Sequence, residues 1–230
     1  MITKKHRSLL FVFVALFASQ SQAEAPVYQN IKRSFEERAA DLVSRMTLEE
    51  KVAQMQNDAP AIERLGVPKY EWWNEALHGV ARAGEATVFP QAIGLAASFD
   101  PKMMLEVATV ISDEGRAKYH EFSSRDQRNR YQGLTFWSPN INIFRDPHWG
   151  RGQETYGEDP HLTAQLGIAF VKGLQGDHPK YRKTDATAKH FAVHSGPEHN
   201  RHEFDARPTE RDLYETYLPA FQALVQEANV

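Results

Sequence analysis

The sequence predicts a parallel β/α fold, either a barrel or a doubly wound sheet, and two features of the chain indicate this class. Short segments of β-type residues alternate with longer amphipathic segments along the chain. Polar and aromatic residues gather directly after the β-type segments, which is where parallel β/α folds bind their ligands. Both architectures are compatible with this pattern.

The composition is that of a globular protein. Of 230 residues, 41% are hydrophobic and 25% are charged, the net charge is −3, and cysteine is absent. These values exclude disordered, collagen-like and disulfide-stapled chains. The near-neutral charge gives no electrostatic case for binding nucleic acid or an anionic membrane surface. Without disulfides, stability has to come from a hydrophobic core.

Residues 1–23 predict a secretory signal peptide. Three basic residues lie among the first seven, an apolar run covers residues 9–18, and small residues stand at positions 21 and 23. The run is about half the ~20 residues that a membrane-spanning helix needs, which disfavours the alternative of a membrane anchor. We therefore expect residues 24–230 to form a mature chain that is secreted or periplasmic, with no membrane contact after cleavage.

Two capping boxes predict two short helices near the start of the mature chain. Ser34 with Glu37, and Thr47 with Glu50, can each satisfy free backbone amides at a helix start. Residues 69–73 then predict a short strand after a Gly-Val-Pro turn. Apolar residues expected on the buried faces of the two helices are Ala39, Leu42, Val43, Val52 and Met55.

Two Asp-Pro pairs predict the starts of two longer helices. Asp100-Pro101 and Asp159-Pro160 each combine a capping aspartate with proline at the first helical position. Gly176 is expected to end the second of these helices. Their expected buried residues are Met104, Val107, Ala108 and Ile111 in the first, and Leu162, Leu166, Ala169 and Phe170 in the second.

The remaining predicted elements are two strands and a final helix. Strands are expected at residues 134–137 and 184–191. Thr209 and Asp212 are expected to cap the last helix. Its apolar face is expected to consist of Leu213, Tyr217, Leu218, Phe221, Leu224 and Val225.

The first segment whose residues are suited to ligand binding or catalysis is 72–79, which follows a predicted strand. Trp72 and Trp73 precede the carboxylate of Glu75. An indole face can receive the C–H face of a pyranose, while a carboxylate accepts hydrogen bonds from two vicinal hydroxyls. The alternative is that both indoles are buried and that Glu75 is a charge at a helix start.

The second segment is the long loop 138–160. A loop of this length and charge inside a compact domain is typical of a functional site. Arg145 and Arg151 carry fork-shaped donors that can bind hydroxyl pairs or hold a carboxylate. We expect one arginine to face a ligand and the other charges to form an ion-pair network. The acids of that network are Asp146, Glu154, Glu158 and Asp159.

The third segment places Lys189 and His190 at the end of a predicted strand. Neighbouring strand residues point to opposite faces unless the backbone is bent there. Four histidines between residues 190 and 202 raise the alternative of a metal site. The Ser-Gly-Pro sequence at 195–197 breaks any helix that would pair His190 with His194, and no HExxH-type pattern is present. We predict no metal and, because no glycine-rich phosphate loop occurs, no cofactor.

These segments carry a family resemblance. Residues 72–80, 144–160 and 188–191 resemble motifs of glycoside hydrolase family 3, and residues 210–213 and 217–221 also fit. The resemblance extends over about residues 35–230. It implies a (β/α)8 TIM-type barrel that is truncated here, because the barrel is not completed within the 230 residues. In the family an α/β sandwich follows the barrel.

The resemblance also implies function. The family performs retaining hydrolysis of β-linked sugars from the non-reducing end, which implies an oligosaccharide substrate. Matching positions imply that Glu75, Arg151, Lys189 and His190 bind the sugar that is released. The family's nucleophile and acid/base lie later in the polypeptide, so we assign no catalytic residue within this chain.

The side chain at position 75 favours β-xylosidase activity on xylo-oligosaccharides. The string Glu-Ala-Leu-His-Gly at 75–79 resembles the β-xylosidase branch, whereas glucosidases of the family often carry aspartate at this position. The longer glutamate, with Trp73 beside it, leaves less space for a hexose hydroxymethyl group. The alternatives are a β-glucosidase of the same family, a non-catalytic sugar-binding fragment or paralogue, and a metal-dependent hydrolase.

Chain length gives one further expectation. Removal of the first 23 of 230 residues leaves 207, which is below the ~250 typical of a β/α barrel. An unclosed parallel sheet exposes an edge and part of its core. We therefore expect the C-terminal part of the same polypeptide to complete the fold, and the 230-residue chain alone to fold poorly and to lack activity.

Overall fold

The computed structural model describes residues 25–194 and 196–230. The predicted signal peptide at residues 1–23 lies outside the described residues. The chain divides into two compact units, one ending at Met46 and the other covering Thr47–Val230. None of the described helices combines the length and the apolar character needed to cross a membrane.

The first unit contains the 3-10 helix η1 (Val27–Gln29) and the helix α1 (Phe35–Arg45). The predicted capping box is confirmed: Ser34 Oγ accepts from the Glu37 amide at 3.1 Å, and Glu37 Oε2 accepts from the Ser34 amide at 3.0 Å. The predicted buried face of α1 is wrong, because no residue of α1 is buried and Val43 is 48% exposed. Within the described part of this unit, residues 25–46, the short η1 is the element that packs on α1.

The second unit begins with α2 (Leu48–Ala53), the 3-10 helix η2 (Glu63–Leu65) and a small antiparallel pair. Thr47 and Glu50 form the predicted capping box. The predicted buried face of α2 is also wrong, because Val52 and Met55 are 56% and 87% exposed. The strand expected at 69–73 is shorter than predicted: β2 (Tyr70–Glu71) pairs with β1 (Asp58–Ala59) over two residues.

The next helices of the second unit are α3 (Ala92–Ala96), α4 (Pro101–Ser124) and α5 (Pro160–Gln175). The predicted caps are confirmed. Asp100 accepts from two amides of the first turn of α4, Asp159 accepts from the Leu162 amide at 2.6 Å, and α5 ends at Gly176 with φ 72°. The expected core residues of α4 are all buried.

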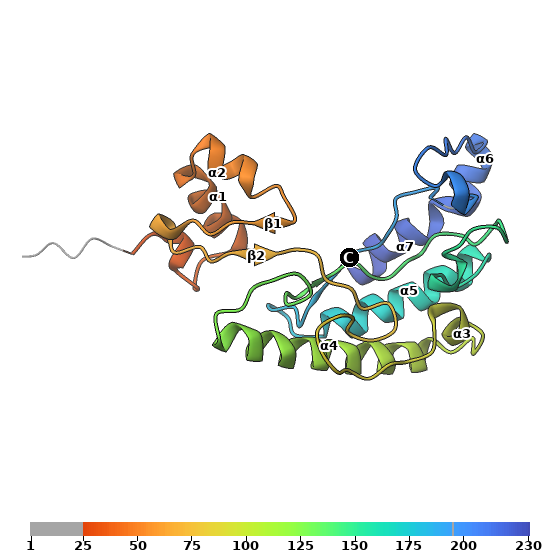
Figure 1. The fold of residues 1–230 in the computed structure, drawn as a ribbon, viewed down its shortest axis with the longest axis horizontal. Helices are drawn as coiled ribbons and strands as arrows, with labels where there is room; N and C mark the ends of the chain where they lie inside the picture. The colour runs from red at the N-terminus through yellow and green to blue at the C-terminus, as the bar shows by residue number, and fades with distance from the viewer. Residues whose placement is uncertain (1–24, 195) are drawn as a thin grey trace, which may run out of the picture. The chain divides into compact units, whose positions relative to one another are not determined.

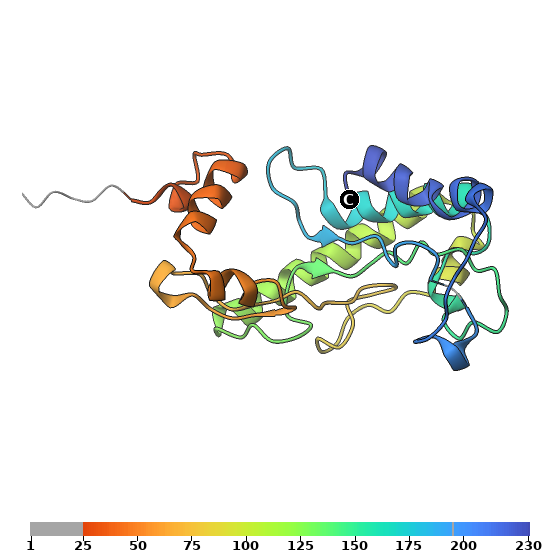
Figure 2. The same ribbon diagram turned by 90° about the horizontal axis from the view of Figure 1, so that it is seen from above.

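Helices α4 and α5 lie side by side, with α7 (Pro219–Ala228) next to α5 (Figures 1 and 2). A glycine permits the close approach of α4 and α5. A Cβ atom at Gly173 would lie 2.6 Å from Ala108 Cβ and 2.7 Å from the Leu105 carbonyl oxygen. The backbone of α5 at Gly173 can therefore lie in direct contact with the Ala108 side chain of α4.

The parallel pairing of the second unit is limited to short stretches. β3 (Thr135–Phe136) pairs in parallel with β4 (Asp185–Ala186). Single parallel bridges join Asn74 to Phe136 and Asn140 to Lys189. Three chain segments thus run side by side in parallel, as the β/α prediction requires. The barrel implied by the resemblance is not seen within the described residues. In the segments 134–137 and 184–191, fewer residues are paired with a neighbouring strand than the sequence predicted.

The predicted final helix is interrupted. Thr209 Oγ1 accepts from the Asp212 amide at 3.1 Å and caps α6 (Glu210–Asp212). A π-helical turn, η5 (Leu213–Tyr217), follows, and α7 begins at Pro219. Proline has no amide hydrogen, so it cannot continue the i→i−4 ladder. The Leu218 amide instead donates to the Leu213 carbonyl at 2.9 Å, five residues back.

Candidate sugar-binding site

A pocket of about 300 Å³ lies in the second unit and brings together three of the four predicted sugar-binding residues. Glu75 follows the bridge at Asn74, Lys189 stands at the bridge to Asn140, and Arg151 precedes the 3-10 helix η3 (Gly152–Glu154). Other lining residues are Trp73, Leu77, His78, Gly79, Ala81, Arg82, Tyr131 and Glu154. The parallel bridges thus position segments that are more than a hundred residues apart in the sequence.

Glu75 and Lys189 form an ion pair in this pocket. Lys189 Nζ donates to Glu75 Oε2 at 3.0 Å, and the side chains are 10% and 23% exposed for Lys189 and Glu75 respectively. Among the described residues, Glu75 Oε1 has no hydrogen-bond partner. One carboxylate oxygen therefore remains as an acceptor, and the ammonium keeps two hydrogens that it can donate.

Arg151 and Glu154 form a two-point ion pair on the pocket wall. Arg151 Nε and Nη2 donate to the two carboxylate oxygens of Glu154 at 2.9 and 2.6 Å. The hydrogen bond to Glu154 raises the pKa of Arg151. Burial acts to raise the pKa of Glu154, but the hydrogen bonds and charge of Arg151, with the charge of Lys189, outweigh it and lower that pKa.

The charged loop 138–160 contains separate ion pairs and a helix cap, where the sequence predicted an ion-pair network. Asp146 bonds His148 Nδ1 at 3.0 Å, and Asp159 caps α5. Arg145 stands over the rings of Phe204 and Tyr217 at 5.9 and 5.1 Å and does not line the pocket. Of the two arginines proposed as ligand-facing, Arg151 therefore occupies the pocket.

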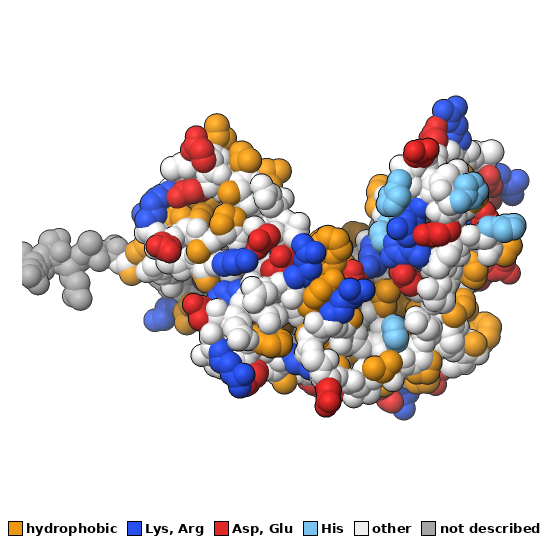
Figure 3. Space-filling model, viewed as in Figure 1, with side chains coloured by type: hydrophobic (Ala, Val, Ile, Leu, Met, Phe, Trp, Pro, Cys, Tyr) orange, Lys and Arg blue, Asp and Glu red, His pale blue; other side chains and the backbone are white. Residues whose placement is uncertain are grey.

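His190, the fourth predicted residue, lies beside the pocket and is not among its lining residues. Its ring stacks on His194 with centroids 4.1 Å apart and 27° between planes. Burial, followed by the neighbouring charges of His194, Arg151, Lys189 and Arg201, lowers the pKa of His190 to about 3. Figure 3 shows histidines next to basic and acidic side chains on the part of the surface near α6.

The two adjacent tryptophans have different environments. Trp73 lines the pocket, stacks on Trp137 with centroids 4.7 Å apart, and lies under the Arg130 guanidinium at 4.6 Å. Trp72 is 45% exposed and contacts Tyr70 edge-on. Of the two indoles, Trp73 is thus the one that borders the candidate ligand.

Sequence reasoning missed several residues of this pocket. Tyr131 donates its amide to the Trp73 carbonyl at 3.1 Å, and Arg82 stands 5.7 Å over the Tyr131 ring. Tyr131 precedes the predicted strand at 134–137, so the expectation that ligands lie after strand ends did not point to it. Glu154 was expected only as part of an ion-pair network, although the pairing with Arg151 places it in the pocket.

Among residues 25–194 and 196–230, no group of three or more His, Cys, Asp or Glu side chains is arranged to hold a metal ion. The rings of His190 and His194 stack face to face. No residue is therefore assigned to a metal or to a cofactor.

Sequence comparison identifies the family of the chain. Residues 37–230 match the model of the glycosyl hydrolase family 3 N terminal domain. The chain belongs to glycosyl hydrolase family 3. Within the family it is 50% identical over 228 residues to a xylan 1,4-beta-xylosidase of Xylanibacter ruminicola, covering 96% of this chain and 26% of that protein. It is 48% identical over 210 residues to the probable beta-D-xylosidase 7 of Arabidopsis thaliana, covering 83% and 26%.

Solved structures of the family share the fold. A GH3 exo-beta-xylosidase (XlnD), in complex with a xylobiose aziridine activity based probe, matches with a TM-score of 0.78 and 37% identity over 88% of this chain and 27% of that one. A GH3 beta-glucosidase of Bifidobacterium adolescentis matches with a TM-score of 0.66 and 28% identity over 81% and 25%. The chain spans about a quarter of the length of the curated relatives it matches.

Proposed function

We propose that the chain is the N-terminal portion of a retaining, exo-acting β-glycosidase that acts as a β-xylosidase on xylo-oligosaccharides. The observation that carries this proposal is the pocket in which the Glu75–Lys189 pair and Arg151 converge beside Trp73. The similarity to a xylan 1,4-beta-xylosidase over nearly the whole chain supports the choice of substrate.

The pocket residues have the donor and acceptor pattern that a terminal sugar needs. A hydroxyl group both donates and accepts one or more hydrogen bonds, so a sugar is held best by acceptors and donors together. Glu75 accepts, whereas Lys189 and Arg151 donate charge-assisted bonds. Because these groups are held by the sheet bridges and by Glu154, they fix the sugar ring and so orient the anomeric carbon for attack.

The reaction itself requires two further carboxyl groups. Retaining glycosidases use a nucleophile and an acid/base about 5 Å apart. Glu75 and Glu154 are both engaged with cations in the pocket, so we assign neither to those roles. We propose that the nucleophile and the acid/base come from the later part of the polypeptide, and that the protein is secreted or periplasmic.

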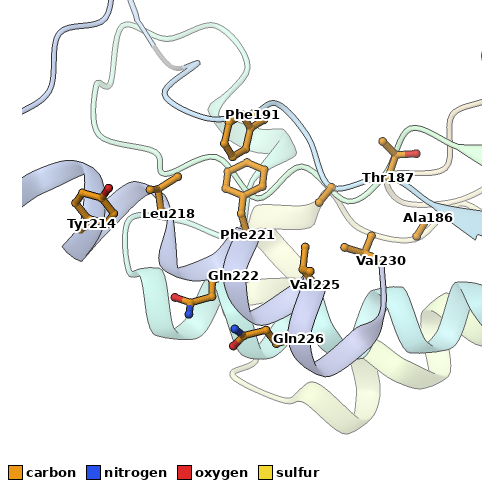
Figure 4. Close-up of a pocket in the computed structure, with 11 residues that line it drawn as sticks. Ala186, Thr187, Phe191, Tyr214, Leu218, Phe221, Gln222, Val225, Gln226 and Val230 are labelled. Carbon is orange, nitrogen blue, oxygen red and sulfur yellow. The ribbon is translucent and has the colours of Figure 1, made fainter. Parts of the chain in front are cut away.

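The second unit also has an exposed apolar surface. An apolar groove of about 720 Å³ runs between α7 and the segment after β4 (Figure 4). Phe191 and Val225 line it and are 79% and 59% exposed. Apolar exposure on this scale marks a surface that binds another element. We propose that residues beyond Val230 pack there, beside the edge of β4.

Pentose specificity is proposed on the basis of Glu75 and Trp73. The glutamate side chain enters a pocket of only about 300 Å³, and Trp73 is fixed at its wall by Trp137 and Arg130. Xylose lacks the hydroxymethyl group of glucose and therefore needs less space. The solved beta-glucosidases of the family make β-glucosidase activity the second candidate.

The test compares turnover of aryl β-xyloside and aryl β-glucoside by the polypeptide in its natural length. We expect the xyloside to have the larger kcat/KM. A tenfold preference for the glucoside, about 1.4 kcal/mol of transition-state stabilisation, would reverse the assignment. Saturable xylose binding without turnover of either glycoside would favour the non-catalytic sugar-binding reading.

A further inference from the structure

Asn142 is a buried amide that is bonded entirely to the segment carrying His190. It is 1% exposed. Its Nδ2 donates to the carbonyl oxygens of His190 and Ala192 at 2.7 and 3.1 Å. Its Oδ1 accepts from the His190 amide at 2.9 Å and lies 2.9 Å from His190 Nδ1.

These partners fix the direction of each hydrogen bond. A backbone carbonyl can only accept and a backbone N–H can only donate, so Nδ2 and Oδ1 of Asn142 cannot be exchanged. Oδ1 is therefore an acceptor toward the imidazole as well. His190 Nδ1 must carry the hydrogen, and in the neutral ring the Nε2 atom is then left with a free lone pair.

The surroundings keep the ring neutral. Burial of His190 lowers its pKa to about 3, and the neighbouring charges act in the same direction. The titratable and charged groups acting on His190 are His194, Arg151, Lys189 and Arg201. Glu154 and Glu198 act on His194, whose own pKa is lowered chiefly by burial.

We propose that Asn142 is a positioning residue that holds His190 in the Nδ1–H tautomer, so that Nε2 accepts a hydrogen bond from a hydroxyl of the bound sugar. This inference rests on the proposed function, because it needs a sugar beside His190. Among residues 25–194 and 196–230, no group is hydrogen-bonded to His190 Nε2.

A hydrogen-bond acceptor at His190 Nε2 complements the two hydrogen-bond donors of the pocket, Lys189 and Arg151. Lys189 and Arg151 can only donate, so a hydroxyl whose oxygen accepts from either of them still has its own hydrogen to place. The neutral Nε2 of His190 can receive that hydrogen. If His190 were an imidazolium, its Nε2 would be a further hydrogen-bond donor beside the cations of Lys189 and Arg151. The hydrogen of the sugar hydroxyl would then have no acceptor at His190.

The tautomer can be observed without any ligand. The polypeptide in its natural length is labelled with 15N-histidine, and His190 is assigned by comparison with the His190→Phe variant. At neutral pH we expect Nδ1 to give a pyrrole-type signal and Nε2 a pyridine-type signal. The opposite pattern, or a doubly protonated ring, overturns the inference.

The direction of the sugar contact is tested with substrate analogues. Aryl β-xylosides that carry hydrogen or fluorine in place of the 3- or 4-hydroxyl are compared, because fluorine can weakly accept but cannot donate. At the position that faces His190, we expect the fluoro compound to lose about tenfold in kcat/KM, because fluorine cannot donate to Nε2, and the deoxy compound to lose at least as much. A fluoro compound that keeps the full kcat/KM of the parent would mean that no hydroxyl hydrogen is donated to His190, and would overturn the inference.

A matched pair of variants separates positioning from packing. Gln175 is also a buried amide: it donates to the carbonyl oxygens of Ala228 and Asn229 at 3.1 and 3.3 Å and accepts from Arg182 Nη1 at 3.1 Å, and it does not line the sugar pocket. In Asn142→Asp the new carboxylate favours imidazolium, so we expect KM for the xyloside to rise about tenfold as the pH falls toward the raised pKa of His190. Gln175→Glu should show no such pH-dependent change, and equal behaviour of the two variants would overturn the inference.

The outcomes distinguish this inference from the proposed function. A protein that turns over no xyloside but shows the Nδ1–H tautomer overturns the proposed function, while Asn142 keeps its effect on His190. An active xylosidase with the Nε2–H tautomer overturns this inference alone. If Asn142→Asp fails to fold, the tautomer spectrum and the fluorinated substrates still decide.

Discussion

Glu154→Gln tests whether the carboxylate of Glu154 positions Arg151 for the sugar. Glu154 accepts two charge-assisted hydrogen bonds from Arg151, at 2.9 and 2.6 Å, and the two side chains are only 18% and 24% exposed. Glutamine keeps the shape but can accept only one of these bonds, and its amide hydrogens face an arginine N–H. Losing one charge-assisted bond costs about 2 kcal/mol, which corresponds to roughly a 30-fold loss in kcat/KM.

The assay measures kcat/KM for an aryl β-xyloside with the polypeptide in its natural length. Glu158→Gln is the matched control, because Glu158 lies in the same loop, is exposed and does not line the sugar pocket. Arg151→Met and the double variant complete a cycle. If Glu154 acts through Arg151, the double variant is no worse than Arg151→Met alone. A Glu154→Gln enzyme within threefold of the parent, or fully additive losses, would refute the positioning role.

Four further outcomes are expected. Trp73→Ala should raise the ratio of glucoside to xyloside kcat/KM at least tenfold by opening the pocket wall, and an unchanged ratio would exclude Trp73 from sugar selection. Gly173→Ala should lower the free energy of unfolding by about 1–3 kcal/mol in a denaturation experiment, because the added Cβ would lie 2.6 Å from Ala108 Cβ; equal stability would show that α4 and α5 can separate freely. Because the pKa of Glu154 is lowered in the folded protein, its pairing should stabilise the fold above the ordinary glutamate pKa and lose this effect as the pH falls through the lowered value. Urea midpoints measured against pH should therefore fall more steeply for the parent than for Glu154→Gln, and parallel curves would contradict this reasoning. A chelator should leave glycosidase activity unchanged, whereas loss of activity that added metal restores would favour a metal-dependent hydrolase.

The sequence predicts the local structure of this chain well where the controlling contacts are local. Asp100, Asp159 and Thr47 each cap a helix start through amides within three residues, so the sequence pattern contains the whole interaction. Pro219 can be identified in the sequence as easily as these capping residues, but the prediction of one continuous helix did not take its missing amide hydrogen into account. The break between η5 and α7 follows from that single residue.

Strand extent and helix burial were less predictable because both depend on distant partners. The β-type residues at 184–191 form a ladder only at Asp185–Ala186 and a bridge at Lys189. Val52 and Met55 have helical spacing, yet they are exposed because no described element of their unit covers them. A periodic pattern therefore indicates which face is apolar but does not identify what packs on it.

The candidate site was predictable to the extent that its residues lie at the parallel pairings. Glu75 follows the parallel bridge at Asn74, Lys189 stands at the parallel bridge to Asn140, and the two side chains meet in the pocket. His190 also follows a strand, but Asn142 and His194 hold its ring beside the pocket rather than in its lining. Tyr131 precedes β3 and is held at the pocket by the hydrogen bond from its amide to the Trp73 carbonyl. No sequence pattern predicted this contact.

Asn74 determines more than local packing, because it fixes the register of the segment that carries Glu75. Its side chain ties this segment to Thr135 and Gly133, and its backbone pairs with Phe136. A slip of one residue would turn Glu75 to the other face of the sheet. The Cα position of residue 75 is thus anchored, and only the length of its side chain is free to vary. The depth of the sugar subsite can then be adjusted by single methylene steps at this position without rebuilding a loop.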